Sequence, residues 1–226
     1  MLLTNLFVSY SQKKIIKIEY GITIREEKDL FKDNASLKLL LNKAIDDAKN
    51  HSFTLLIQNE GTKFCHNNAL STGSSLDNNS PLFVNFNGQT YTCNDSIFEH
   101  CPLIGNNVYI LKKSTAKWKI TSEFKFIDNY KCYKATTVYT VESPNTTFNH
   151  PVVAWFCPDL PYSFGPNGYC GLPGLILELQ IRNGVYGVKR IDFNTKDSFD
   201  MRELKGIKII SQKKADDILK EQMREQ

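Results

Sequence analysis

The sequence predicts a mainly β fold of the α+β class: a single large curved antiparallel sheet or half-open barrel, with one early helix and one C-terminal helix. The first reason is the alternation of Ile or Tyr with other residues, mostly polar, over residues 16–24, which is the period of a half-buried strand. The second is the Asn-Gly pairs at 87–88 and 183–184, which lie between β-branched or aromatic runs as hairpin turns do. Helical patterns are confined to residues 35–50 and 215–224, so most of the ordered chain belongs in strands.

The elements follow in chain order. The helix at 35–50 has apolar residues at 3.6-residue spacing, and Asn34 or Ser36 can cap it. The Asn- and Ser-rich segment 67–80 is too polar to order itself and is predicted to be a mobile loop. In residues 117–127, aromatic and Ile side chains alternate with Lys, Thr and Glu. Ten strand-like runs predict about nine strands in meander order. Besides those at 16–24 and 117–127, the runs are 52–59, 81–86, 89–93, 108–112, 130–141, 152–156, 175–181 and 185–193.

Length and composition limit the classes of function. The length of 226 residues suits one domain. We predict that residues 1–12 are the remnant of a secretory signal peptide, that 13–210 form a single antiparallel β domain, and that 211–226 form a C-terminal polar helix. The apolar run in 1–12 is too short for a transmembrane helix, so the sequence predicts an exported protein without one. The net charge of +4 is spread along the chain, which argues against a nucleic-acid partner.

A loop rich in proline and glycine follows residues 152–156. Prolines fix φ and lack an N–H donor, while glycines allow positive φ, so the segment can be neither a regular helix nor a regular strand. Long ordered loops of this kind tend to be functional. The residues that punctuate it are Pro158, Pro161, Gly165, Pro166, Gly168, Gly171, Pro173 and Gly174.

These residues also carry a resemblance. The hexapeptide GLPGLI at 171–176 follows an A-W-x-x-P-x-x-P-x-x-x-G-P run at 154–166, with YKCYKAT at 130–136 and WKI at 118–120. From about Lys13 to its end, the chain resembles the GLPGLI family of exported envelope proteins from Bacteroidetes-type bacteria. The resemblance implies the periplasm or cell surface of a Gram-negative-type bacterium, no assigned activity, and no catalytic residue to transfer. Phe156 and Cys157 depart from the expected Tyr and small polar residue.

The leading hypothesis is a protein that binds an apolar ligand, a peptide or a protein partner through the ordered loop and the concave face of the sheet. An enzyme is the less favoured class, and no cofactor or metal is predicted. The alternatives are a peptidase-like envelope hydrolase that uses Cys157 with His150, or the carboxylates of Asp159 and Glu178, and a structural component of a cell-surface assembly. The predicted binding residues are Trp155, Asp159, Tyr162, Phe164, Tyr169, Leu172 and Glu178.

Six cysteines, an even number, predict disulfides in an exported chain. The pairing preferred among 15 connectivities joins Cys157 to Cys170 around the loop, Cys93 to Cys101, and Cys65 to Cys132. The alternative is that they are buried free thiols, which behave as small apolar residues. Adjacent Cys and His at 65–66 and 100–101 lack the spacing that zinc favours.

Overall fold

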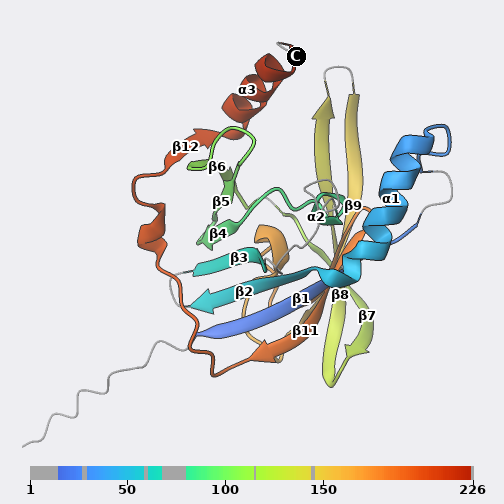
Figure 1. The fold of residues 1–226 in the computed structure, drawn as a ribbon. Helices are drawn as coiled ribbons and strands as arrows, with labels where there is room; N and C mark the ends of the chain where they lie inside the picture. The colour runs from blue at the N-terminus through green and yellow to red at the C-terminus, as the bar shows by residue number, and fades with distance from the viewer. Residues whose placement is uncertain are drawn as a thin grey trace, which may run out of the picture.

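The computed structural model describes residues 15–26, 30–58, 61–67, 80–114, 116–143 and 146–224. Residues 1–12, and all but the ends of segment 67–80, lie outside this part of the chain, so the two predictions made for them concern undescribed residues. One open sheet of twelve strands dominates the fold, with a helix near its beginning and another at its end (Figure 1). The predicted fold class is therefore confirmed, and the sheet does not close into a barrel.

The sheet consists of two antiparallel meanders joined by the first strand. Strand β1 (Ile16–Ile24) pairs with β2 on one side and with β11 on the other. We call β2 to β6 the N-terminal half-sheet and β7 to β11 the C-terminal half-sheet. The N-terminal half-sheet contains β2 (Ser52–Gln58), β3 (Gly61–Asn67), β4 (Thr90–Cys93), β5 (Ser96–His100) and β6 (Val108–Lys113). The C-terminal half-sheet contains β7 (Lys119–Ile127), β8 (Tyr130–Ser143), β9 (Thr146–Cys157), β10 (Leu175–Ile181) and β11 (Gly184–Asp192). A short strand that was not predicted, β12 (Lys208–Ser211), runs parallel to β6 at one edge.

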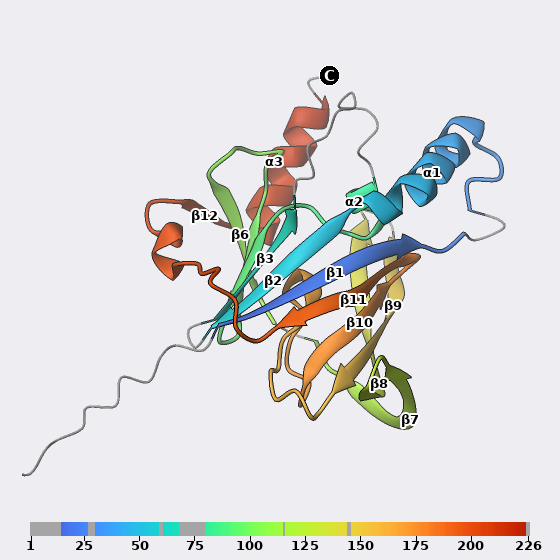
Figure 2. The same ribbon diagram turned by 60° about the horizontal axis from the view of Figure 1, so that its bottom comes forward.

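The sheet is strongly curled. Strands β6 and β7 lie near opposite ends of the strand order, yet only residues 114–118 connect them. The six steps from Lys113 to Lys119 span at most about 20 Å. The two ends of the sheet must therefore approach each other, and the ribbon curves around a concave side (Figure 2).

Left-handed residues at the turns set the hairpin positions. Arg182 (φ 54°) turns β10 into β11, at the hairpin predicted from Asn183-Gly184, and Asp128 (φ 50°) turns β7 into β8, between the predicted strands at 117–127 and 130–141. The predicted strand at 81–86 with a turn at 87–88 is wrong, because Pro81 lies in the short helix α2 (Ser80–Phe83), whose first turn tolerates proline. The hairpin in this region joins β4 to β5 and turns at Asn94 (φ 51°) instead.

Each helix packs through a few apolar residues. Helix α1 (Ala35–Asp47) begins at Asn34, whose Oδ1 accepts a hydrogen bond of 2.9 Å from the Leu37 amide, as predicted for the N-cap. It continues into a 3₁₀ turn, η1 (Ala48–Asn50). Helix α3 (Gln212–Arg224) packs Ala215 and Ile218 against β6 and β12.

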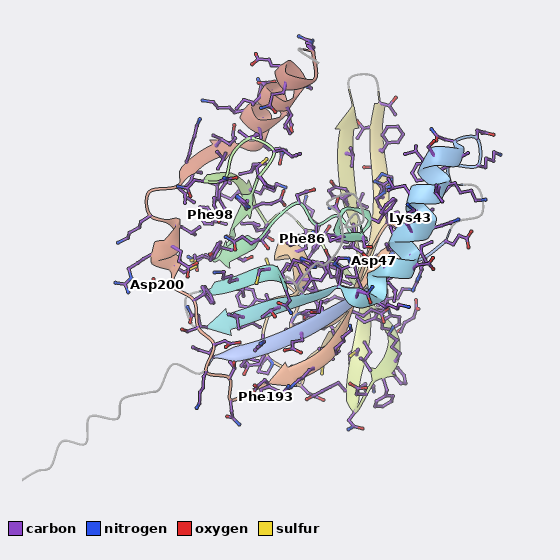
Figure 3. The ribbon with its side chains drawn as sticks, viewed as in Figure 1. Lys43, Asp47, Phe86, Phe98, Phe193 and Asp200 are labelled. Atoms are coloured by element: carbon purple, nitrogen blue, oxygen red, sulfur yellow. The ribbon has the colours of Figure 1, made fainter. Side chains whose placement is uncertain are left out.

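The main core lies on the concave side, where side chains from both half-sheets meet. Phe53 stacks on Phe64 at 5.6 Å and contacts Phe86 and Tyr186 edge-on at 5.0 and 5.3 Å. Figure 3 shows Phe86 between α2 and β3, inside the curve of the sheet. The Tyr186 hydroxyl donates to the backbone oxygen of Val84 at 3.0 Å. The concave side is thus filled by protein.

The opposite, outer side of the sheet differs between the halves. Over the N-terminal half-sheet runs the cover segment, residues 199–207, which includes the 3₁₀ turn η3 (Met201–Leu204). Its apolar residues pack against outer side chains of β2, β4, β5 and β6 in a second core of Leu56, Tyr91, Phe98, Tyr109, Phe199, Met201, Leu204 and Ile207. Over the C-terminal half-sheet, a Cβ added at Gly187 would meet no atom within 4 Å, so this outer face is open there.

Candidate functional site

The Pro/Gly loop, residues 158–174, is held in one shape by its own backbone. Inside it the Gly171 amide donates to Ser163 O at 3.0 Å, and the Leu175 amide, at the start of β10, donates back to Leu160 O at 2.9 Å. At Gly174 (φ 158°) a Cβ would lie 2.2 Å from the backbone oxygen of Cys157, so only glycine fits this close approach. A 3₁₀ turn, η2 (Pro166–Gly168), lies at its centre. The loop is therefore an ordered connection between two paired strands.

The loop aromatics point into the protein. Leu172 is fully buried, and Tyr162, Phe164 and Tyr169 are half-buried and pack against the main core. Burial raises the pKa of Tyr169 well above its ordinary value. The Trp118 indole N–H donates to Cys170 O at 2.9 Å, which fastens the β6–β7 connection to the loop. The loop thus fills the concave side on which a ligand was predicted to bind.

Two of the predicted binding residues lie together on the open outer face instead. Glu178 on β10 and Trp155 on β9 are opposite each other in the sheet register. Lys125 on β7 reaches both: its Nζ lies 2.7 Å from Glu178 Oε2 and 4.6 Å from the centre of the Trp155 ring. Asp159, in the turn after β9, is exposed, with no hydrogen bond or ion pair to another described residue. The predicted set is therefore divided among the core, the outer face and solvent.

Strand β7 presents an apolar strip at the free edge of the sheet. Within the described part of the chain it pairs only with β8. Ile120, Phe124 and Phe126 are 50, 54 and 64% exposed. Their even spacing along the strand, with a register shift between Ile120 and Phe124, places them on the concave side of β7. Lys131 of β8 holds its ammonium 4.4 Å above the Phe124 ring. We call Ile120, Phe124, Phe126 and Lys131 the β7 strip.

A small charged cleft opens on the outer side of β1 and β11. Its volume is about 210 Å³. Lys17 Nζ lies 2.9 Å from Asp197 Oδ2 and 3.4 Å from Glu19 Oε1, and the hydrogen bond to Asp197 raises the pKa of Lys17. These charges offset one another, and the cleft offers no apolar cavity. It is lined by Lys17, Glu19, Arg190, Asp192, Thr195 and Asp197.

All six cysteines are thiols, so the predicted bridges are not formed in this structure. Cys170 donates to Ser114 Oγ at 3.1 Å, while Cys157 lies opposite β8 in the sheet and is fully buried. Cys65 is on β3 and Cys132 on β8, in different half-sheets. Cys93 ends β4, and Cys101 follows β5. Which residues lie next to each cysteine is therefore determined by strand pairing and not by closeness in the sequence.

The geometry does not support the alternative of a hydrolase that uses Cys157 with His150. Cys157 and His150 are seven residues apart on β9, which separates them by about 23 Å and places them on opposite faces. Cys65 and His66 likewise point to opposite sides of β3. No cluster of three or more possible metal ligands occurs among the described residues.

The sequence reasoning missed a hydrogen-bonded chain at the end of α1. The two rings of His51 and His66 meet at 2.8 Å between Nδ1 and Nε2, and His51 Nε2 lies 2.6 Å from Asp47 Oδ2. Ser80 donates to Ala44 O at 2.9 Å. Burial alone would raise the pKa of Asp47, but hydrogen bonds from Asn50, His51 and Ser80 hold it below its ordinary value. The i, i+4 spacing of Asp47 and His51 was the available signal, and the chain fastens α1 to β2, β3 and α2.

The geometry therefore defines an open β-sheet protein with a filled concave side and two exposed surfaces, the outer face and the β7 strip. The model of a Bacteroidetes-associated family described as "Protein of unknown function (Porph_ging)" matches residues 142–178, which span all of β9, the Pro/Gly loop and the first part of β10. No curated protein matches the sequence.

Two solved structures share the fold. They are described as "Structure of PNGF-II in C2 space group" and "Structure of PNGF-II in P21 space group", with 14% and 15% identity and TM-scores of 0.53 and 0.54. Each match covers 91% of this chain but only 32% and 33% of the PNGF-II chain. This chain thus corresponds in fold to about a third of PNGF-II. No helix among the described residues has the length and apolar character needed to cross a bilayer.

Proposed function

We propose that this protein is an exported, non-catalytic binding module that takes up an extended segment of a protein partner by strand addition at β7. The observation that carries the proposal is the β7 strip: three large apolar side chains, each at least half exposed, on one face of a sheet edge. An edge strand with exposed apolar residues is prone to pair with another chain, and proteins normally protect such edges. A persistent apolar edge is accordingly a candidate binding surface.

Strand addition also defines the chemistry of the partner. A segment paired with β7 would place alternate side chains on the concave side, against Phe124 and Phe126, and the others on the outer side, beside Lys125. Lys119 and Lys131 have no carboxylate within ion-pair distance among the described residues. The segment expected to bind therefore alternates apolar and polar residues and carries Asp or Glu.

The rest of the structure favours a protein partner over a small ligand. Ligand pockets usually enclose about 300 to 1,000 Å³ and are mostly apolar, whereas the cleft on β1 and β11 is smaller and charged. The loop aromatics are engaged with the core. We therefore assign binding to the sheet edge rather than to the predicted concave face.

The export and family assignments belong to the same proposal. The GLPGLI hexapeptide and its upstream prolines lie in or next to the stretch matched by the unknown-function family. Membership of the GLPGLI family would place the protein in the periplasm or at the cell surface. In PNGF-II the same fold forms about a third of a longer chain, so there it occurs as one part of a larger protein.

Site-specific photo-crosslinking tests the proposal. A photoreactive phenylalanine analogue replaces Ser122, which is exposed on β7, and the protein is irradiated in native envelope extract. A control protein carries the same analogue at Ile209, exposed on the other edge strand, β12. We expect a defined protein adduct from position 122 alone, identified by mass spectrometry. A synthetic peptide of the crosslinked segment should then bind the unmodified protein in calorimetry.

Replacing Phe124 and Phe126 by Ser should lower the affinity of the protein for that peptide about tenfold or more, since apolar anchors dominate binding energy at interfaces. Leu103→Ser, which removes an exposed leucine remote from β7, should leave the affinity unchanged. Equal adducts at both edges, no adduct at position 122, or an affinity insensitive to Phe124 and Phe126 would each reject strand addition at β7.

A further inference from the structure

Two buried cysteines face each other across the C-terminal half-sheet. The pairing of β8 with β9 runs without a register shift from Ser143 opposite Thr146 to Tyr133 opposite Phe156. The next positions in the same register are Cys132 and Cys157. Both thiols have no exposed surface. They stand on the outer side, because Cys132 is two residues from Lys134 and Cys157 is two residues from Trp155.

This position suits a disulfide. Directly opposite residues of antiparallel strands have Cα atoms about 4.5 to 5.5 Å apart, and disulfides form at Cα separations of about 4.4 to 6.8 Å. Burial raises the pKa of the Cys132 thiol to about 12, and the nearby Cys157 adds to the shift, as expected for two adjacent thiols. The β8–β9 pair is fixed on both sides, by β7 beside Cys132 and by β10 beside Cys157.

We propose that Cys132 and Cys157 form a dithiol–disulfide couple, a redox modification site that joins β8 to β9, and that the structure shows its reduced form. Oxidation requires a small disulfide such as oxidised glutathione. One cysteine thiolate attacks that disulfide and releases a thiol; the second thiolate then displaces the remaining glutathione and closes the protein S–S bond. Two electrons pass to glutathione, and the protons from the two cysteines end on its two thiols.

The structure favours this pairing over the predicted pairs Cys157–Cys170 and Cys65–Cys132. Cys170 lies in the Pro/Gly loop and contacts Ser114, and Cys65 lies in the other half-sheet. The Lys125–Glu178 ion pair joins β7 to β10, so it passes across β8 and β9 on the face that carries both thiols. Because exchange needs a thiolate and access, the bond is expected to form while the chain folds, before this contact closes.

Peptide mapping of the full chain tests the couple. The reduced protein is unfolded, refolded in a glutathione redox buffer, denatured, alkylated with N-ethylmaleimide and digested with trypsin without reduction. Cleavage after Lys131, Lys134 and Arg182 gives a tripeptide, 132–134, and a long peptide, 135–182. We expect these two peptides linked, and separated by reductant. The intact chain should carry four adducts, since six cysteines less two leave four.

The long peptide also contains Cys170, so Cys170→Ser is the matched control and should keep the link. Cys132→Ser and Cys157→Ser should each abolish it and give five alkylated thiols. The oxidised wild-type protein should melt roughly 5 to 10 °C above its reduced form, a shift expected for closing a loop of this length in a chain of this size and absent in Cys132→Ser. Six adducts after the redox buffer, or an alkylated free tripeptide, would disprove the couple.

Discussion

The two half-sheets share one concave core but differ on their outer faces. The N-terminal half-sheet has an apolar outer face, and the cover segment buries it. The C-terminal half-sheet has Glu178, Gln180 and partly exposed Trp155 on its outer face, and Gly187 is open there. Figure 3 shows Phe98 of β5 and Asp200, beside η3, on the same side of the molecule.

The difference means that one half of the sheet is stabilised by burial on both faces, while the other half keeps one face exposed. Burial of apolar side chains stabilises a fold at about 25 cal/mol per Å², so the N-terminal half-sheet gains stability from both of its faces. The C-terminal half-sheet depends on its concave face and on the Pro/Gly loop. Its outer face and its β7 edge remain available for contact with other molecules.

The largest test compares one phenylalanine from each half. Phe199→Ala should lower the free energy of unfolding by about 3 to 5 kcal/mol, because this side chain of the cover segment is buried against Tyr91. Phe126→Ala should change it by less than about 0.5 kcal/mol, because that ring is exposed. Urea titrations of both variants measure the contrast. Equal losses of unfolding free energy in the two variants would show that Phe126 on β7 contributes as much to stability as Phe199 in the cover segment.

A smaller effect is expected at the carboxylate that holds the cover segment. Glu203 accepts hydrogen bonds from Lys63 at 2.8 Å and from the Tyr91 hydroxyl. Burial alone would raise the pKa of Glu203, but these hydrogen bonds and the Asp200 amide hold it below its ordinary 4.5. The folded protein thus favours the carboxylate, so this stabilisation is present above about pH 4.5 and is lost as the pH falls through the lower pKa of the folded state.

Glu203→Gln should therefore cost about 1 kcal/mol at neutral pH, with the difference from wild type shrinking toward about pH 3. Urea unfolding at several pH values measures it. Glu123→Gln, at an exposed ion pair with Lys134, is the control and should have little effect at any pH. A loss from Glu203→Gln that stays constant with pH would show that the carboxylate charge is not what holds the cover segment.

An effect on stability no larger than that of Glu203→Gln is expected at the corresponding carboxylate of the open half. Glu178→Gln removes the ion pair with Lys125, whose side chains are 22 and 35% exposed, and should cost no more than about 1 kcal/mol. Its clearer consequence is kinetic: alkylation of Cys132 in the native reduced protein should become faster. Mass spectrometry of timed N-ethylmaleimide reactions measures the rate, with Glu123→Gln again as control. An unchanged rate would mean that this contact does not shield the thiol.

Much of the sheet was predictable because strand alternation and turn residues act locally. The strands at 16–24 and 117–127 and the hairpins at Asp128 and Arg182 follow from side-chain period and turn chemistry. The hairpin at 87–88 failed because a proline in the first turn of a short helix resembles the start of a strand in sequence. The short strand β12 forms only because the chain returns to β6, a pairing that no local pattern encodes.

The site residues likewise include some that the local sequence indicates and others that only the pairing of distant strands brings together. Trp155 and Glu178 were predicted as binding residues, but Lys125, which contacts both, comes from a strand about thirty residues before Trp155 in the chain. Cys132 and Cys157 were both noted, yet their juxtaposition depends on the register between β8 and β9. Pairing by proximity in sequence gave Cys157 with Cys170, but in this structure the Cys170 thiol donates to Ser114.

The sequence by itself determined the β class, the positions of most strands and the ordered Pro/Gly loop, because these depend on φ preferences and on the two-residue period of a strand. Only the tertiary structure decided that the loop fills the concave side, that one outer face is covered while the other is open, and which residues meet there. Those outcomes depend on the curl of the sheet and on contacts between distant strands, which no short stretch of sequence contains.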